Sequence, residues 1–298
     1  MPDNTYTLAE KEEALKDQLE AFKHDEALKE MLDILEVDAE SVKERYNGRL
    51  CGARVIETQE LDHMGFLEDK REALYPLFKE LGFIDINRPL RNENSHVIVL
   101  GGSINACKDR TEAAARFIDD TTACVSGLSC YRPVSPVERT GGAGTNFDTE
   151  FGAMSESFAR TFGLDREAYT EDFKSDRNLN SISCIRTYEK DGRPYRIFAA
   201  PSSEPDKRRA DTGDTFDHYM AKAGGIKEDA SYLFVTNNRY CNRQFLQLAY
   251  RMIKGRYPGT IDVVGCFENE RIVTVDRYDP FQYLQDIIAI IDWADRFI

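Results

Sequence analysis

Apolar residues recur three or four positions apart from about residue 7 to residue 82, as in Leu15, Leu19 and Phe22. This spacing places them on one face of an α-helix, so the pattern predicts helices throughout this part of the chain. The charged residues between them fall on the solvated faces of amphipathic helices. We therefore expect residues 1–90 to form an N-terminal helical region that serves as a helical layer or as the surface of a homo-oligomer.

A second pattern begins near residue 94, where short apolar runs alternate with helical periodicity. The runs are residues 96–100, 123–126, 232–236 and 261–267. Short apolar strands separated by amphipathic helices are typical of a parallel sheet covered on both faces. Between residues 184 and 200, the pair Asp191-Gly192 predicts an antiparallel hairpin. We expect an α/β domain over residues 91–298, and a C-terminal helix that packs on the sheet or on the N-terminal helices.

Composition narrows the classes of partner. The 298 residues include 39 Lys and Arg against 53 Asp and Glu, a formal net charge of −14. Such a surface repels phosphate backbones and anionic lipids, which disfavours nucleic acid and membrane partners. The first residues lack the apolar segment of a secretory signal and no window is long enough to span a bilayer, so we expect a cytosolic protein.

Cysteine and histidine usage bears on redox state and metals. The 7 cysteines are widely spaced without a CxxC motif, a pattern of reduced thiols rather than a disulfide framework. The 4 histidines form neither HxH nor HExxH, so no zinc site is predicted. Ser103 lacks the context of a nucleophile elbow, which disfavours a serine hydrolase.

The first candidate site follows the run at 96–100, where Gly101, Gly102 and Ser103 precede a predicted helix. Glycine lets backbone N–H groups approach an oxyanion, and a helix start favours negative charge. The pattern is neither GxGxxG nor GxxxxGK[ST]. The alternative is a tight turn in which Asp109 caps the helix and Glu112 completes a capping box.

The second candidate site follows the run at 123–126. Ser126 and Gly127 end the predicted strand, and a loop over residues 128–146 then carries Arg132 and Arg139. A loop of this length is usually a functional lid or a disordered insert. Glu150 begins the next helix, where it either faces the ligand or interacts with the helix dipole.

The third candidate site is the stretch "VTNNRYCNRQF" at 235–245, in which Arg239 and Arg243 lie near a helix start. Exposed cations there cost about 0.3 to 1 kcal/mol each, so they require an anionic partner, either a bound phosphate or a carboxylate. Asn237 or Asn238 is the expected N-cap.

A neighbouring element offers such carboxylates. The stretch "ADTGDTFDHYM" begins a helix with Thr212 or Asp214 as the expected cap. Asp211, Asp214 and Asp217 are candidates for neutralising the arginines or for acid–base chemistry. Salt bridges within the fold are the alternative.

The order of these motifs resembles the YdcF/SanA/ElyC-like family, a domain of unknown function. The resemblance spans Val97 to Cys266 and rests on "VIVLGG", "VSG", "TEFGAM", "DTFDHY" and "VTNNRYCNRQF". It implies a Rossmann-like fold with a polar cleft at the strand ends. The residues that match the family's motifs are Gly101, Gly102, Ser126, Gly127, Glu150, Asp214, Thr215, Asp217, Thr236 and Arg243.

This chain departs from the family pattern at three positions. Leu128 replaces the last glycine of an SGG turn, Asp214 replaces an asparagine, and Tyr240 replaces a frequent histidine. The tyrosine at position 240 suggests that this protein has a different activity from that of its relatives, or that it only binds a ligand.

The sequence thus predicts a small anionic or nucleotide-like ligand at the strand ends. The predicted acid–base or hydroxyl-binding residues are Glu150 and Asp214. The predicted ligand-binding residues are Gly101, Gly102, Ser103, Ser126, Gly127, Thr215, Thr236, Tyr240 and Arg243. No cofactor is assigned, and a metal-bridged phosphate is not indicated. The alternative is a non-catalytic binding protein whose N-terminal helices form the partner surface. A cleft filled by Tyr131, Phe147 or Tyr240 would favour that alternative.

Overall fold

The computed structural model of the protein describes residues 8–46, 67–85, 87–140, 147–223, 227–266, 274–276 and 278–297. One sheet contains seven strands: β1 (His96–Leu100), β2 (Cys124–Ser129), β3 (Thr170–Lys174), β4 (Ser183–Lys190), β5 (Arg193–Ala199), β6 (Ser231–Asn237) and β7 (Thr260–Cys266). The four apolar runs correspond to β1, β2, β6 and β7, so these predicted strands are confirmed.

The strand order across the sheet is β3-β4-β5-β2-β1-β6-β7. Neighbours from β5 to β7 are parallel, whereas β3 and β4 are antiparallel and lie beside β5. The parallel part has the 3-2-1-4-5 order of a doubly wound sheet, which confirms the α/β, Rossmann-like prediction. The winding reverses between β1 and β6, and ligands of such sheets bind at this switch point.

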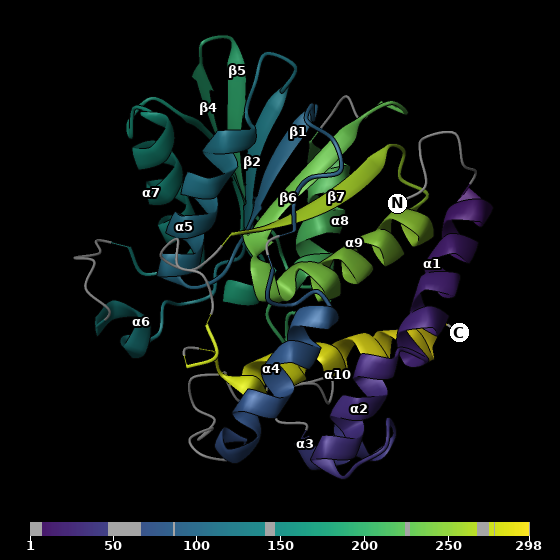
Figure 1. The fold of residues 1–298 in the computed structure, drawn as a ribbon. Helices are drawn as coiled ribbons and strands as arrows, with labels where there is room; N and C mark the ends of the chain where they lie inside the picture. The colour runs from purple at the N-terminus through teal and green to yellow at the C-terminus, as the bar shows by residue number, and fades with distance from the viewer. Residues whose placement is uncertain are drawn as a thin grey trace.

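Helices cover both faces of the sheet (Figure 1). On one face lie α5 (Ile104–Ala114) and α7 (Glu150–Phe162), and on the other lie α8 (Thr212–Lys222) and α9 (Cys241–Gly255). In β1, Val97 and Val99 pack in the core on the α5 side, whereas Ile98 and Leu100 pack in the core on the α8 side. Because side chains alternate across a strand, a sheet buried on both faces requires an unbroken apolar run.

A further helical layer lies outside α9 (Figure 1). It contains α1 (Leu8–Lys23), α2 (Glu26–Leu35), α3 (Ser41–Tyr46), α4 (Arg71–Glu80) and the C-terminal α10 (Pro280–Phe297). Leu28, Phe78 and Ile287 from these helices belong to the same hydrophobic cluster as Phe234 of β6. The C-terminal helix therefore packs on the N-terminal helices, one of the two expected positions.

The hairpin prediction is confirmed, and one strand was not expected. β4 and β5 are joined by Asp191 and Gly192, whose φ angles are 54° and 75°. Two successive left-handed residues are typical of a type I′ hairpin turn. β3 pairs with β4 at the sheet edge and is exposed along its whole length. A solvated edge strand needs no apolar run, so the hydrophobic pattern does not reveal it.

The remaining elements are short. They are α6 (Pro136–Thr140) and the single 3₁₀ turns η1 (Glu68–Lys70), η2 (Ala115–Phe117), η3 (Leu179–Ser181) and η4 (Asn238–Tyr240). Of these, α6 and η4 lie next to the strand ends that form the candidate site.

Candidate functional site

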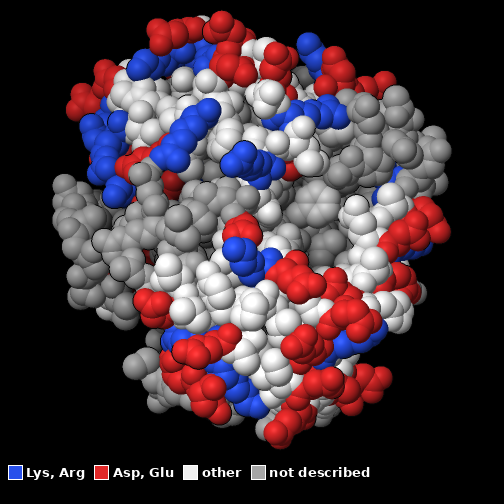
Figure 2. All heavy atoms as spheres, viewed as in Figure 1, with Lys and Arg blue, Asp and Glu red and all other residues white. Residues whose placement is uncertain are grey.

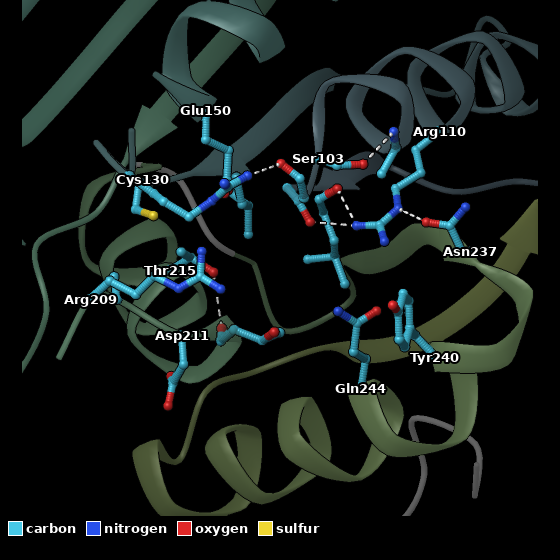
Figure 3. A pocket seen from close by; sticks show the side chains of 18 of the residues that line it. Ser103, Arg110, Cys130, Glu150, Arg209, Asp211, Thr215, Asn237, Tyr240 and Gln244 are labelled. Carbon is cyan, nitrogen blue, oxygen red and sulfur yellow. Dashed lines mark hydrogen bonds and ion pairs between the residues drawn. The ribbon is translucent and has the colours of Figure 1, made fainter. Parts of the chain in front are cut away.

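A cavity of about 380 Å³ lies at the carboxyl ends of β1, β2 and β6. Its wall is formed by the turn after β1, the segment after β2, the start of α8, and residues of η4 and α9 (Figure 3). Tyr240 forms part of the wall, and Tyr131 and Phe147 do not belong to it. The cavity therefore occupies the switch point of the sheet and is not filled by these three rings.

The turn after β1 has no room for side chains. A β-carbon on Gly101 would lie 2.2 Å from Oε1 of Glu150 and 2.6 Å from the carbonyl oxygen of Leu128. A β-carbon on Gly102 would lie 3.3 Å from Nη1 of Arg110. A side chain at position 101 is therefore excluded by a backbone carbonyl, whereas one at position 102 would be tight against Arg110, and both glycines line the cavity.

Ser103 caps α5. Its Oγ accepts a hydrogen bond from the backbone N–H of Ala106 at 3.3 Å, and the helix begins at Ile104. The predicted cap at Asp109 is wrong, because Asp109 lies inside α5. A serine just before an apolar residue was the stronger start signal, since its side chain reaches the third N–H of the helix.

Four backbone N–H groups at this helix start make no hydrogen bond to any residue that the structure describes. They belong to Gly102, Ser103, Ile104 and Asn105. The first N–H groups of a helix have no partner inside it, and together with the helix dipole they favour a bound anion. The wall of the cavity therefore presents a row of donors.

Arg110 lies behind that row and is 2% exposed. Its Nε donates to Oδ1 of Asn237 at 2.7 Å, and its Nη1 donates to the carbonyl oxygens of Leu100 and Gly101 at 2.8 and 2.5 Å. All three acceptors are neutral, and within the described ranges no carboxylate forms an ion pair with this guanidinium. A buried cation without a counter-charge is costly, so an anion in the cavity would stabilise it.

Two residues that line the cavity carry buried amides; Figure 3 shows that Gln244 points into the cavity, whereas Asn237 turns its oxygen to Arg110. Asn237 is 3% exposed and Gln244 is 7% exposed. Nδ2 of Asn237 and Oε1 of Gln244 have no hydrogen-bond partner among the described residues. Buried polar atoms in folded proteins are almost always paired, so the amide of Gln244 indicates a missing polar partner in the cavity.

Asn237 is the N-cap residue of η4, as expected, but its side chain does not cap. Asn237 makes no side-chain capping bond, because its Oδ1 accepts from Arg110. Asn238 donates through Nδ2 to the carbonyl oxygens of Phe83, Ile84 and Asp85. Its side chain therefore fastens the segment after α4 to the end of β6.

A buried ion network forms the β2 side of the cavity. Nε of Arg132 donates to Oε2 of Glu150 at 3.0 Å, Nη1 donates to Oε1 of Glu138 at 2.7 Å, and Nη2 donates to the carbonyl oxygen of Gly102 at 2.8 Å. Burial lowers the pKa of Arg132, but the two carboxylates outweigh it and raise the pKa overall. Arg132 thus joins the loop after β2 to the start of α7 and to the turn after β1.

The predicted loop over residues 128–146 is partly structured by this network. β2 extends to Ser129, and α6 supplies Glu138. Arg139 points away from the cavity wall and forms an exposed ion pair with Asp148. The glycines at 141, 142 and 144 lie outside the described residues.

Three arginines surround the ring of Tyr240. The guanidinium carbons of Arg239, Arg243 and Arg110 lie 4.4, 5.2 and 5.7 Å from its centroid. Nε of Arg243 donates to Oδ1 of Asp286 at 2.6 Å. The expected pairing of Arg243 with an aspartate of the 211–217 segment is therefore wrong, and its carboxylate partner comes from α10.

Three predicted ligand residues lie inside the sheet. They are Ser126 and Gly127 in β2 and Thr236 in β6. Ser126 and Thr236 are 0% exposed, and none of the three residues lines the cavity. A β-carbon on Gly127 would lie 2.7 Å from Cγ of Met154, so this glycine allows α7 to pack on β2. None of the three reaches the cavity, because β2 continues to Ser129 and β6 continues to Asn237, each beyond its apolar run.

Asp214 is also a structural residue rather than part of the cavity wall. Asp211 caps α8 by accepting from the N–H of Asp214 at 3.0 Å, and Asp214 accepts from Nη1 of Arg208 at 2.5 Å. Burial raises the pKa of Asp214, but hydrogen bonds from Arg208 and the backbone lower it overall. The expected cap at Thr212 or Asp214 is thus corrected to Asp211, while Thr215 does line the cavity as predicted.

The remaining aspartate of this segment is also paired within the fold. Asp217 forms an ion pair with Nη1 of Arg251 at 2.9 Å, and neither residue lines the cavity. The salt-bridge alternative therefore holds for both Asp214 and Asp217.

Thiol and metal chemistry finds no support in the described chain. Its six cysteines are free and buried, and burial raises the pKa of Cys107 and Cys130 to about 12. Such thiols are inert rather than nucleophilic. No cluster of three or more potential metal ligands occurs in the described ranges.

The charge of the cavity wall differs from that of the molecule. Figure 2 shows acidic side chains gathered over the lower part of one face, where the N-terminal helices lie. The cavity wall instead contains five arginines against three carboxylates.

None of the described helices is long and apolar enough to cross a membrane.

The known proteins that this chain resembles are themselves uncharacterised. No protein-family model and no solved structure matches the chain. Uncharacterised proteins of Mycobacterium bovis and of two Mycobacterium tuberculosis strains are each 25% identical over 241 residues. The match covers 74% of this chain and 64% of each relative, so the chain spans less than two thirds of the curated relatives it matches. The YdcF/SanA/ElyC-like resemblance stays a prediction.

Sequence reasoning missed several residues of the wall. Arg110, Glu138 and Gln244 line the cavity, but the sequence motifs do not predict them as site residues. Gln244 lies next to Arg243, which the motifs do predict. The signal for Arg110 was its place at the seventh position of α5, two turns behind the glycines on an otherwise small-residue face. A long cation on a face that must pack against a sheet requires a polar reason to be buried.

Proposed function

We propose that this protein binds a small anionic or nucleotide-like ligand in the cavity between the ends of β1 and β6. The observation that carries the proposal is the convergence on one cavity of a buried cation and of polar groups that no described residue satisfies. The N–H row at the start of α5, the guanidinium of Arg110 and the amides of Asn237 and Gln244 all border the same space. A phosphate group accepts from backbone N–H groups and from arginine in this arrangement.

The site residues then take different roles. The backbone at Gly102 and Ser103 would hold a phosphate, and Arg110 would neutralise its charge. Glu150 lies on the opposite wall with one oxygen bonded to Arg132, and it would accept a hydrogen bond from a ligand hydroxyl. Ser126, Gly127, Thr236 and Asp214 receive no role, since they do not line the cavity.

The alternative of a partner surface on the N-terminal helices is less well supported. The apolar residues Leu15, Leu19, Leu28 and Met31 are buried in the core that these helices share with α10. An apolar face that is already covered by the same chain offers little area to another protein.

Gln244→Leu provides the test of the proposed site. We expect this variant to fold as well as the wild type, because it removes a buried amide that has no partner among the described residues and replaces it with an apolar group of similar size. We expect its affinity for the ligand to fall by about 10-fold or more, since a hydrogen bond to a charged group contributes roughly 1.5 to 3 kcal/mol. Calorimetric titration with nucleotides, sugar phosphates and inorganic phosphates measures the affinity.

Gln247→Leu is the matched control. Gln247 lies on the same helix, three residues from Gln244, and does not line the cavity. The Gln247→Leu variant should bind each nucleotide, sugar phosphate and inorganic phosphate with the affinity of the wild type. Absence of binding across the panel, or wild-type affinity in Gln244→Leu, would contradict the proposed site.

A further inference from the structure

Resting on the proposed function, we propose that the ligand carries two linked phosphate groups and that the cavity holds a separate subsite for each. The first subsite is the N–H row of residues 102–105. The second, which we call the Tyr240 subsite, consists of Arg239, Tyr240, Arg243 and Gln244. The ligand class is therefore a diphosphate, free or esterified.

The Tyr240 subsite presents guanidinium donors of Arg243 that no described residue accepts from. Asp286 bonds to Arg243 through Nε, and the two terminal amino groups of Arg243 make no hydrogen bond to a described residue. Arg110 adds a further guanidinium 5.7 Å from the Tyr240 centroid, with no carboxylate paired to it in the described chain. Arginine binds phosphate through two parallel donors, which a guanidinium held at Nε can still present.

Gln244 gives an independent indication of a ligand at this subsite. Its side chain is 93% buried (7% exposed), and its amide makes no hydrogen bond to any residue that the structure describes. In Figure 3 its amide and the ring of Tyr240 lie side by side and point into the cavity from the helix opposite Ser103. This unpaired amide is therefore on the far side of the cavity from the N–H row.

Arg110 connects the two subsites. Its Nη1 lies at the carbonyl oxygens of Leu100 and Gly101, where the N–H row begins, and its guanidinium also lies over the ring of Tyr240. One guanidinium thus borders both anion positions. Two phosphates that share a bridging oxygen are close enough to bind on either side of a single guanidinium, whereas one phosphate occupies only one position.

Calorimetric titration in magnesium-free buffer with inorganic phosphate and inorganic pyrophosphate tests this inference. We expect the wild type to bind pyrophosphate at least 10-fold more tightly than phosphate. The double variant Arg243→Gln/Asp286→Asn removes one cation together with its carboxylate, so the net charge of the protein is unchanged. In this variant the preference for pyrophosphate should fall at least fivefold while the affinity for phosphate is retained.

Arg251→Gln/Asp217→Asn is the matched control, because it removes another ion pair between α9 and α8 that lies outside the cavity wall. It should keep the wild-type preference for pyrophosphate, and circular dichroism should show both double variants folded. Equal affinities for the two anions in the wild type, or a preference that survives in Arg243→Gln/Asp286→Asn, would overturn the inference while leaving a single-phosphate site. Failure of both anions and of all nucleotides to bind would remove the proposed function and the inference together.

Discussion

His96, at the start of β1, is held in its neutral form by its surroundings. Its Nδ1 lies 2.9 Å from the hydroxyl of Tyr219, and its ring centroid lies 5.0 Å from that of Tyr232. Burial, with a smaller contribution from the charge of Arg196, lowers the pKa of His96 from 6.5 to about 4. Between these values the unfolded chain binds a proton that the folded protein excludes.

The stability of the protein should therefore fall as the pH is lowered from 6.5 towards 4. Above pH 6.5 the histidine is neutral in both states and contributes no pH dependence. At pH 5 the penalty is about 2 kcal/mol. Urea unfolding at pH 7.5 and pH 5 should show that His96→Asn loses less stability on acidification than the wild type. The control His24→Asn changes a side chain that is 77% exposed, so it should lose as much stability on acidification as the wild type. Equal losses of stability in all three proteins would show that His96 is not the origin of the pH dependence.

At the scale of single residues, the sequence reveals the site only where local chemistry decides it. Gly101, Gly102 and Ser103, which the sequence predicts as ligand-binding residues, lie in the cavity wall, because a turn between a strand and a helix limits their roles. Arg110 was not predicted, because its neutral partners come from β1 and β6, and Gln244 was not predicted, because its importance comes from a hydrogen bond that no described residue supplies. A missing hydrogen bond has no sequence pattern, so it becomes visible only in three dimensions.

At the scale of elements, the buried strands and the start of α7 at Glu150 were predicted, whereas the starts of α5 and α8 were not. β1 and β6 are apolar on both faces, and the sequence shows this directly. The starts of α5 and α8 were placed at the wrong residues, because each neighbourhood contains several polar residues able to cap. At the start of α8, the carboxylates of Asp211 and Asp214 each accept a hydrogen bond from the other residue's backbone N–H. Both therefore resemble a capping residue in the sequence, which does not identify Asp211 as the N-cap.

The turn between β4 and β5 allows a prediction at this scale. Gly192 has a φ of 75°, and a β-carbon added there would meet no atom within 4 Å. Gly192→Ala should therefore destabilise the protein by about 1 kcal/mol through the left-handed backbone alone. Asp191→Asn should change the stability by less than about 0.5 kcal/mol, since asparagine tolerates this conformation. Urea unfolding compares the two, and an unchanged stability in Gly192→Ala would mean that the turn differs from the one described.

At the scale of the whole molecule, the N-terminal helices and the sheet are joined by one core. The hydrophobic cluster that contains Leu28 of α2 continues through α10 to Phe234 in the middle of β6. Asn238 adds a polar connection, because its amide holds the segment after α4 at the end of the same strand. Unfolding of the helical layer, which includes α10, would therefore uncover the outer face of α9.

We expect the described helical layer and the sheet to unfold in one transition. Trp293 of α10 is the single tryptophan of the chain, and its ring lies against Tyr250 of α9. Its fluorescence reports the helical layer, whereas far-ultraviolet circular dichroism reports all elements, so their urea midpoints should coincide. Leu28→Ala should lower both midpoints together, at a cost of about 2 to 5 kcal/mol for a buried leucine. Leu179→Ala, at a residue that is 50% exposed, should leave them unchanged. A fluorescence transition that precedes the other would show that the layer unfolds independently, and Leu28→Ala would then shift only the first of the two.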